Sequence, residues 1–211
     1  MLRCFKRGSL YQSSLVNAPF RSPTLDIVSI TVAVIALWLA SQIAVPLTPV
    51  PITLQTLAVV LTGFLLGSIL GFLAAVTWLI LGALGLPFFA EGAGGIEHLT
   101  GPTAGYLWSF PFAAAVAGLG AQRDRRTTLW LFLLAISAHL ITLGAGALWL
   151  GTRIGAEAAL LKGVLPFLPG AALKSAVAAF LVSCARRLRG LRRVPDREAE
   201  RGRSRDGASS R

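Results

Sequence analysis

The sequence predicts an all-α integral membrane protein with six transmembrane helices. Of its 211 residues, 55% are hydrophobic and only 14% are charged, whereas a soluble domain is usually about a quarter charged because its surface faces water. Several apolar runs reach roughly 20 residues, the length that crosses a bilayer core of about 30 Å. Basic residues gather in a few short segments. Together these observations predict that most of the protein surface faces lipid.

Six apolar segments follow one another along the chain. They cover residues 25–44, 52–66, 68–89, 102–121, 129–150 and 164–185. The first segment ends in a proline-rich turn at residues 45–51, because proline removes a backbone donor and stops a helix. Gly67 forms a very short turn between the second and third segments.

The later boundaries are polar or basic. A glycine-rich segment with two glutamates, residues 91–98, follows the third helix, and a basic loop at residues 122–126 separates the fourth helix from the fifth. Residues 151–162 connect the fifth helix to the sixth. Each predicted helix is therefore delimited by a segment typical of loops.

The distribution of charge predicts the orientation. Basic residues precede the first helix, occupy the loop at residues 122–126 and dominate the chain after residue 186. Lys and Arg are enriched in cytoplasmic segments, and an even number of crossings places all three on that side. We therefore expect a cytoplasmic N-terminal segment (residues 1–24), a six-helix transmembrane domain (residues 25–185) and a cytoplasmic basic tail (residues 186–211). The tail has too little apolar surface to fold, so we predict that it is disordered.

Several classes of function lack the residues that they require. The net charge of +11 suggests nucleic acid, but no aromatic residue interleaves with the basic tail. The chain has no phosphate-binding G-x-x-x-x-G-K-[ST] loop. Its two histidines, His98 and His139, are too far apart for a zinc site, and Ser137 points to a different helix face from His139. We expect no enzyme, no metal, no cofactor and no nucleic-acid partner.

Lys174 is the most informative single residue. It lies well inside the last apolar segment, and no acidic residue is near it in the sequence. An ionisable group at membrane depth is costly unless it faces a cavity, a partner or a ligand, and an ammonium group suits a carboxylate. The alternative is a lysine that snorkels to the outer interface or pairs with Glu91 or Glu97.

Two proline-rich segments, residues 45–51 and 166–169, lie near the expected outer face. Irregular backbone at that depth is tolerated where it lines a cavity or is buried by protein. Because Thr53 and Gln55 are nearby, these segments suggest a polar cup open to the outside. Ordinary loop prolines at helix starts are the alternative.

The first predicted helix carries a ridge of small residues. Ala36, Ala40 and Ala44 repeat every four residues, a spacing that lets another membrane helix approach closely. The ridge predicts helix docking, either within this chain or on a partner.

Four stretches carry a resemblance to a known family. They read VPLTPVPITLQTLAVVLTG at residues 45–63, GALGLPFFA at residues 82–90, GPTAGY at residues 101–106, and PFLPG at residues 166–170 followed by Lys174. They resemble the BioY-type biotin transporters, which are substrate-capture (S) components of the energy-coupling factor family. The first stretch is the specific one, and the resemblance covers residues 25–185.

The resemblance implies a multi-pass subunit of the bacterial cell (inner) membrane that captures biotin from the outside and delivers it inward. In such systems a separate energy-coupling membrane subunit and two ATPase subunits usually drive transport, which fits the missing phosphate-binding loop. Family S components dock that membrane partner through small residues on the first helix. Ala36, Ala40 and Ala44 match this pattern.

The resemblance also implies a ligand site in which Lys174 engages the carboxylate of biotin. Hydrogen bonds to the polar ring would come from Gln55, Thr53, Tyr106 and Glu91, and apolar walls from Phe88 and Trp78. In the family, Gly170 is commonly followed by an aspartate, and here that residue is Ala171. This removes a carboxylate that would accept a ureido N–H or orient the lysine. Trp78 stands where the family often has tyrosine.

Two other functions compete with this one. A stand-alone secondary transporter or channel for another carboxylate vitamin predicts transport by this protein alone, without ATP. A structural membrane subunit predicts no binding of any vitamin.

Overall fold

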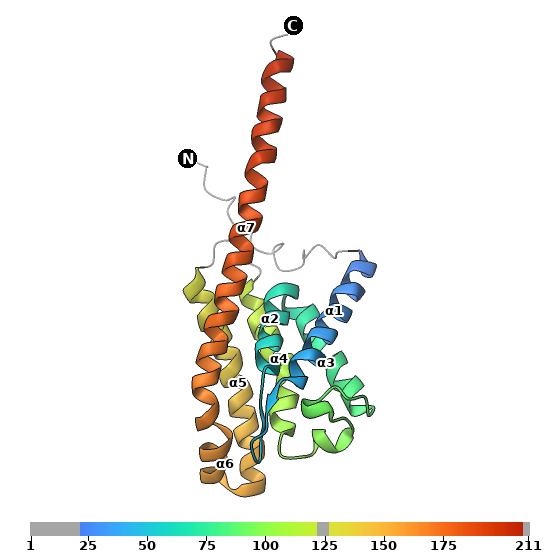
Figure 1. The fold of residues 1–211 in the computed structure, drawn as a ribbon, viewed down its shortest axis with the longest axis vertical. Coiled ribbons are helices and arrows are strands. Elements are labelled where there is room, and N and C mark those ends of the chain that lie inside the picture. The colour runs from blue at the N-terminus through green and yellow to red at the C-terminus, as the bar shows by residue number, and fades with distance from the viewer. Residues whose placement is uncertain (1–21, 122–126, 209–211) are drawn as a thin grey trace, which may run out of the picture.

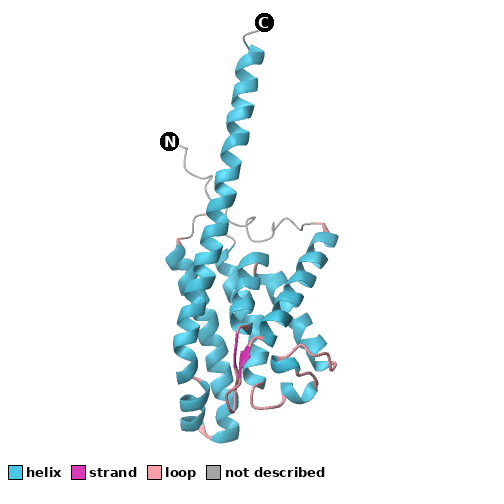
Figure 2. Ribbon diagram, in the orientation of Figure 1, coloured by secondary structure: helices cyan, strands magenta, loops and turns pink. Residues whose placement is uncertain are grey.

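The computed structural model describes residues 22–121 and 127–208, with side chains for residues 22–119 and 127–188. The described chain is helical apart from connecting loops and one small β-hairpin (Figure 1, Figure 2). The elements are α1 (Pro23–Gln42), β1 (Ala44–Val45), β2 (Ile52–Thr53), α2 (Gln55–Leu66), α3 (Ser68–Ala83), η1 (Ala90–Gly92), η2 (Ile96–Leu99), α4 (Ala104–Ala121), α5 (Thr128–Ile154), α6 (Ala156–Gly163), η3 (Leu165–Phe167) and α7 (Leu168–Ala208). The all-α prediction is confirmed.

Within the part of the chain that the structure describes, three segments are long and apolar enough to cross a membrane, Pro23–Gln42, Thr128–Ile154 and Ala156–Leu188. Three shorter apolar helices accompany them, Gln55–Leu66, Ser68–Ala83 and Ala104–Leu119. Large apolar side chains point outward from several helices; for example, Ile69 is 68% exposed and Leu148 is 78% exposed. Exposed apolar side chains in this number suit contact with lipid. The number of crossings and the sidedness of the termini stay predictions.

Helix α4 lies at the centre of the bundle and packs against α2, α3 and α5. The approach is close because glycines lie at the contacts between α4 and its neighbours. A Cβ at Gly63 would overlap the carbonyl oxygen of Ala114, and a Cβ at Gly118 would overlap the backbone at Ser68. Small residues at contact points bring membrane helices together, since lipid tails provide no hydrophobic driving force between helices. These contacts hold the helices that surround the site.

The proline-rich segment forms a hairpin instead of a simple turn. Helix α1 ends at Gln42, and β1 pairs antiparallel with β2, Ala44 opposite Thr53 and Val45 opposite Ile52. The prolines between the strands cannot donate backbone hydrogen bonds, which favours extended chain. Helix α2 consequently begins at Gln55, three residues later than predicted. Ala44 therefore lies in a strand, and the predicted helical ridge of Ala36, Ala40 and Ala44 is wrong at its last member.

Helix α3 ends at Ala83, well before the predicted end at residue 89. Gly85 follows at φ +95°, a left-handed conformation that glycine adopts easily and that commonly ends helices. Residues 84–103 then form a loop that contains η1 and η2. The apolar sequence LGLPFF at residues 84–89 was predicted as helix, but Gly85 and Pro87 make it part of this loop.

The last third of the chain contains more helix than predicted. Helix α5 continues to Ile154, and α6 occupies the segment expected to be a loop. Helix α7 starts at Leu168 and continues to Ala208, whereas residues 186–211 were expected to be disordered. Extending an existing helix avoids the cost of nucleating one, and Arg, Glu and Ala are good helix formers. Helix α7 therefore continues without interruption through the predicted boundary at residue 186.

Candidate functional site

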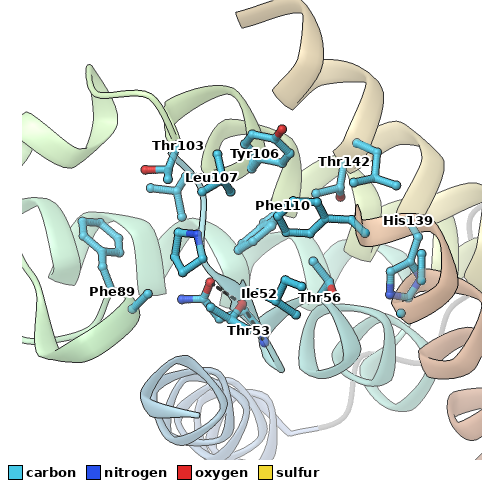
Figure 3. Close-up of a pocket in the computed structure, with 18 of the residues that line it drawn as sticks. Ile52, Thr53, Thr56, Phe89, Thr103, Tyr106, Leu107, Phe110, His139 and Thr142 are labelled. Carbon is cyan, nitrogen blue, oxygen red and sulfur yellow. Dashed lines mark hydrogen bonds between the residues drawn. The ribbon is translucent and has the colours of Figure 1, made fainter. Parts of the chain in front are cut away.

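A cavity of about 350 Å³ opens where the β-hairpin, the loop at residues 84–103 and helices α2, α4, α5 and α7 meet. Figure 3 shows side chains from these elements around it. Its lining comprises Val50, Pro51, Ile52, Thr53, Gln55, Thr56, Phe89, Ala90, Glu91, Ala93, His98, Thr103, Tyr106, Leu107, Phe110, His139, Thr142, Leu143, Pro166, Phe167, Gly170, Ala171 and Lys174. The size is within the range of small-molecule sites, about 300–1,000 Å³.

Lys174 reaches the cavity from the first turns of α7. Its Nζ atom donates to the carbonyl oxygen of Thr53 at 2.5 Å and to Oγ1 of Thr56 at 3.2 Å. Both partners are neutral, so the structure does not pair this ammonium with Glu91 or Glu97. An ammonium has three protons, and the two bonds leave one for another acceptor. Lys174 is half-buried, and its uncompensated charge would attract an anionic group.

Thr53 and Gln55 are coupled at the junction of β2 and α2. The Thr53 hydroxyl donates to Oε1 of Gln55 at 3.0 Å, and the Gln55 backbone N–H donates to Thr53 Oγ1 at 3.3 Å. The Gln55 side chain is only 5% exposed, yet its Nε2 has no hydrogen-bond partner. A buried amide donor without a partner is destabilising by about 1–3 kcal/mol. Gln55 is therefore placed to donate to a bound molecule.

Aromatic side chains form the apolar part of the wall. Phe89 and Phe110 line the cavity, and Tyr106 and Phe167 face each other with ring centroids 6.3 Å apart. The Tyr106 hydroxyl donates to the carbonyl oxygen of Gly163 at 2.7 Å. The hydroxyl proton is therefore used in a hydrogen bond within the protein. The ring can still pack against a ligand, and the oxygen can still accept a hydrogen bond from it.

Comparisons with known proteins agree with this architecture. The BioY family model matches residues 12–190. The chain belongs to the BioY family. A probable biotin transporter BioY from Pyrococcus horikoshii is 43% identical over 164 residues, which are 75% of this chain and 96% of that protein. The biotin transporter BioY from Thermotoga maritima is 37% identical over 140 residues, 66% of this chain and 82% of that protein.

The fold of this BioY-family chain is also similar to a solved structure. The crystal structure at 2.1 Å of the S-component for biotin from an ECF-type ABC transporter matches with a TM-score of 0.69. The match covers 81% of this chain and 95% of that one at 23% sequence identity. The relatives named above are transporters, not enzymes.

Five of the seven predicted ligand residues of this BioY-family chain meet at the cavity: Lys174, Gln55, Thr53, Tyr106 and Glu91. Phe88 and Trp78 do not line it. Phe88 stacks on Trp38 with ring centroids 6.1 Å apart, and Trp78 is fully buried behind Phe89, 5.2 Å between centroids. Phe89, the next residue after Phe88, lines the cavity because the loop turns its side chain inward. Phe110, which packs against Trp78, also lines the cavity.

Sequence reasoning did not assign to the site five polar residues that line the cavity, Thr56, His98, Thr103, His139 and Thr142. His139 on α5 lines the cavity and is only 3% exposed. It was considered in the sequence only as a metal ligand or as a partner of Ser137. The signal that identified Lys174, an ionisable group in the middle of an apolar span, applies equally to His139.

Ala171 lies in the wall of the cavity, one turn before Lys174 on α7, and is 4% exposed. The structure therefore places the position of the missing aspartate beside the lysine.

Glu91 lies in the 3-10 turn η1, is exposed, and has φ 60°.

The remaining small-residue ridge lies on the outside of the bundle. Ala36 is exposed and Ala40 is half-buried on α1. The same helix holds the loop at residues 84–103, which contributes to the cavity lining, because Trp38 Nε1 donates to the Pro87 carbonyl oxygen at 2.9 Å and Gln42 Nε2 donates to the same oxygen at 3.3 Å. Helix α1 thus combines an outward surface with a link to the site.

Proposed function

We propose that this chain is a biotin uptake subunit that captures biotin at the outer face of the membrane and delivers it inward. The observation that carries the proposal is the cavity itself, in which the Lys174 ammonium, the unpaired Nε2 of Gln55 and the aromatic wall are brought together. Biotin offers a carboxylate, a cyclic urea and an apolar ring and chain. The membership in the BioY family and the relatives named as biotin transporters support the same ligand.

In this proposal Lys174 attracts the carboxylate of biotin with its remaining proton. Gln55 Nε2 donates to the carbonyl of the urea, and Thr53, Tyr106 and Glu91 offer further hydrogen-bonding atoms. Phe89 and Phe110 pack on the apolar ring and chain in place of Phe88 and Trp78. A few placed polar groups within an aromatic wall are the usual composition of a specific small-molecule site.

The proposed topology has six crossings, α1 to α5 and α7, with both termini in the cytoplasm. Helix α6 has eight residues, about 12 Å at 1.5 Å per residue, and lies wholly at one end of the bundle (Figure 1), so we do not count it as a crossing. The start of α1 and the end of α7 lie at one end of the bundle, and α6 and the loop of the hairpin at the other (Figure 1). Basic cytoplasmic ends therefore direct the cavity outward. We assign the chain to a bacterial cell (inner) membrane.

We further propose that a separate energy-coupling membrane subunit and two ATPase subunits drive the transport. The exposed Ala36 and half-buried Ala40 on α1 offer a surface on which a membrane helix of the partner packs closely. The absence of a phosphate-binding loop from the sequence supports an external source of energy.

Uptake of radiolabelled biotin by cells that lack their own biotin transporter tests the function. Expression of this chain together with an energy-coupling module should give saturable, ATP-dependent uptake. Vesicles that contain only this protein should transport nothing. Transport by those vesicles without ATP would assign a stand-alone secondary transporter, and failure of both experiments together with no biotin binding would favour a structural subunit.

A further inference from the structure

His139 is a second buried polar group of the cavity, and the proposed function above does not use it. It projects from the middle of α5 and is 3% exposed, and Figure 3 shows its imidazole on the α5 side of the cavity. An imidazole carries two nitrogens with separate hydrogen-bonding roles. The contacts of one nitrogen determine what the other can do.

The Nδ1 atom carries the proton. It lies 2.8 Å from the carbonyl oxygen of Ala135, and two lone pairs at that distance would repel, so Nδ1 must donate. Nδ1 is also 3.1 Å from Oγ of Ser175. The Ser175 hydroxyl donates its single proton to the carbonyl oxygen of Ala171 at 2.7 Å, which leaves the Ser175 oxygen as an acceptor toward His139. Both neighbours therefore favour the same tautomer.

The Nε2 atom is consequently an acceptor, and it has no partner. It is buried and makes no hydrogen bond to any residue that the structure describes. A charged imidazolium would be costly in this position without a carboxylate, and the hydrogen-bond partners of the ring within residues 22–119 and 127–188 are Ala135 and Ser175. Most buried polar atoms find a partner. An orphan acceptor in the wall of a cavity indicates a donor on the bound molecule.

We propose that His139 is a specificity-determining residue that accepts a hydrogen bond from a ring N–H of the ligand through Nε2. This inference rests on the proposed function and deepens it. Gln55 supplies an unpaired donor and His139 an unpaired acceptor, which together complement the C=O and N–H groups of a cyclic urea. A carboxylate ligand without an N–H leaves His139 unpaired, and sites built for a hydrogen bond reject analogues that lack it.

Calorimetric titration of the detergent-purified chain with biotin and with its two isomers methylated at one ureido nitrogen tests this role. The unaltered protein should bind one isomer at least tenfold more weakly than biotin. His139→Leu should weaken biotin binding by about 10- to 100-fold, the range expected for an unpaired buried group. It should bring biotin and the disfavoured isomer to within about twofold of each other.

Ser137→Ala is the matched control. Ser137 lies on the same helix but is exposed, and its hydroxyl donates to the carbonyl oxygen of Leu133 at 2.7 Å. This variant should keep both the affinity for biotin and the discrimination against the methylated isomer.

Two results would overturn the inference while leaving the proposed function intact. One is that the unaltered protein binds biotin and both isomers within threefold of each other, a result that does not depend on the folding of any variant. The other is that folded His139→Leu binds biotin as the unaltered protein does. Absence of biotin binding by the unaltered chain would instead overturn the proposed function, and this inference with it.

Discussion

The position of Lys174 at the cavity explains why a charged side chain occurs in an apolar segment. Its ammonium is held by a backbone carbonyl and a threonine hydroxyl, at Thr53 and Thr56. These neutral bonds orient the side chain without neutralising it. A charge kept unpaired at membrane depth is a functional feature by default, and the cavity beside it supports the proposed role of Lys174 in binding.

Replacing Lys174 with alanine should weaken biotin binding by at least tenfold, or about 1.4 kcal/mol. The loss should be much smaller for biotin amide, which has no carboxylate to attract. Titration of both ligands against both proteins measures the difference. Lys162→Ala, an exposed lysine on α6 outside the cavity lining, is the control and should bind as the unaltered chain. An affinity of Lys174→Ala for biotin within threefold of the original would show that the lysine does not bind the carboxylate.

At the scale of elements, glycine contacts set how closely α2, α3 and α4 pack. Gly63→Ala should destabilise the bundle by about 1–3 kcal/mol, the usual effect of overpacking, because the added methyl overlaps the Ala114 carbonyl oxygen. The midpoint of thermal unfolding in detergent should fall measurably.

Gly144→Ala is the matched control for that substitution. A Cβ at Gly144 on α5 meets nothing within 4 Å, and alanine has the higher helix propensity. The unfolding midpoint should stay the same or rise. Equal destabilisation by both substitutions would contradict the packing argument.

Helix α1 and the loop at residues 84–103 are linked through Trp38, whose indole N–H bonds to Pro87 and whose ring stacks on Phe88. The loop contributes Phe89 and Glu91 to the cavity. Trp38→Ala should therefore accelerate dissociation of biotin several-fold, measured by chasing labelled biotin with excess unlabelled ligand. Leu39→Ala, which shortens an exposed neighbour on α1, should leave the rate unchanged. Equal rates in the two variants would mean that the loop does not retain the ligand.

Sequence reasoning predicted the apolar helices well because length and composition are enough to recognise them. It placed their ends less well. The prolines before Gln55 form a hairpin, and the glycines after Ala83 end α3 early, outcomes that depend on backbone pairing and conformation not visible in hydropathy. Because Ala44 lies in the hairpin, it is not part of the predicted ridge on the first helix.

The site was predicted in part for a related physical reason. Lys174, Gln55 and Thr53 stand out because polar groups are unexpected in apolar surroundings. The choice between Phe88 and Phe89 depends on how a loop turns, and an apolar sequence holds no sign of it. His139 carried the same signal as Lys174, and the role that we propose for it rests on the hydrogen bonds to Ser175 and Ala135, which only folding creates.

For the molecule as a whole, binding and transport should be separable. Ala36→Leu together with Ala40→Leu would place bulky side chains on the outer surface of α1, where we propose that the energy-coupling subunit packs. Biotin uptake by cells should fall at least tenfold, while biotin binding by the purified chain stays unchanged. Ile35→Leu, a volume-conserving change at an exposed position on α1, is the control. Uptake unaffected by the double substitution would place the partner surface elsewhere.

The ligand of the intact chain is the central claim, and one titration tests it most directly. The detergent-purified protein is titrated with biotin and, in parallel, with thiamine, riboflavin and lipoate. The account predicts saturable binding of biotin alone, with a Kd in the nanomolar range. This corresponds to a binding free energy of roughly −12 kcal/mol. Lipoate is the informative competitor because it offers a carboxylate and an apolar ring without a urea. No saturable binding of biotin by the folded protein, or binding of lipoate as tight as that of biotin, would contradict the account.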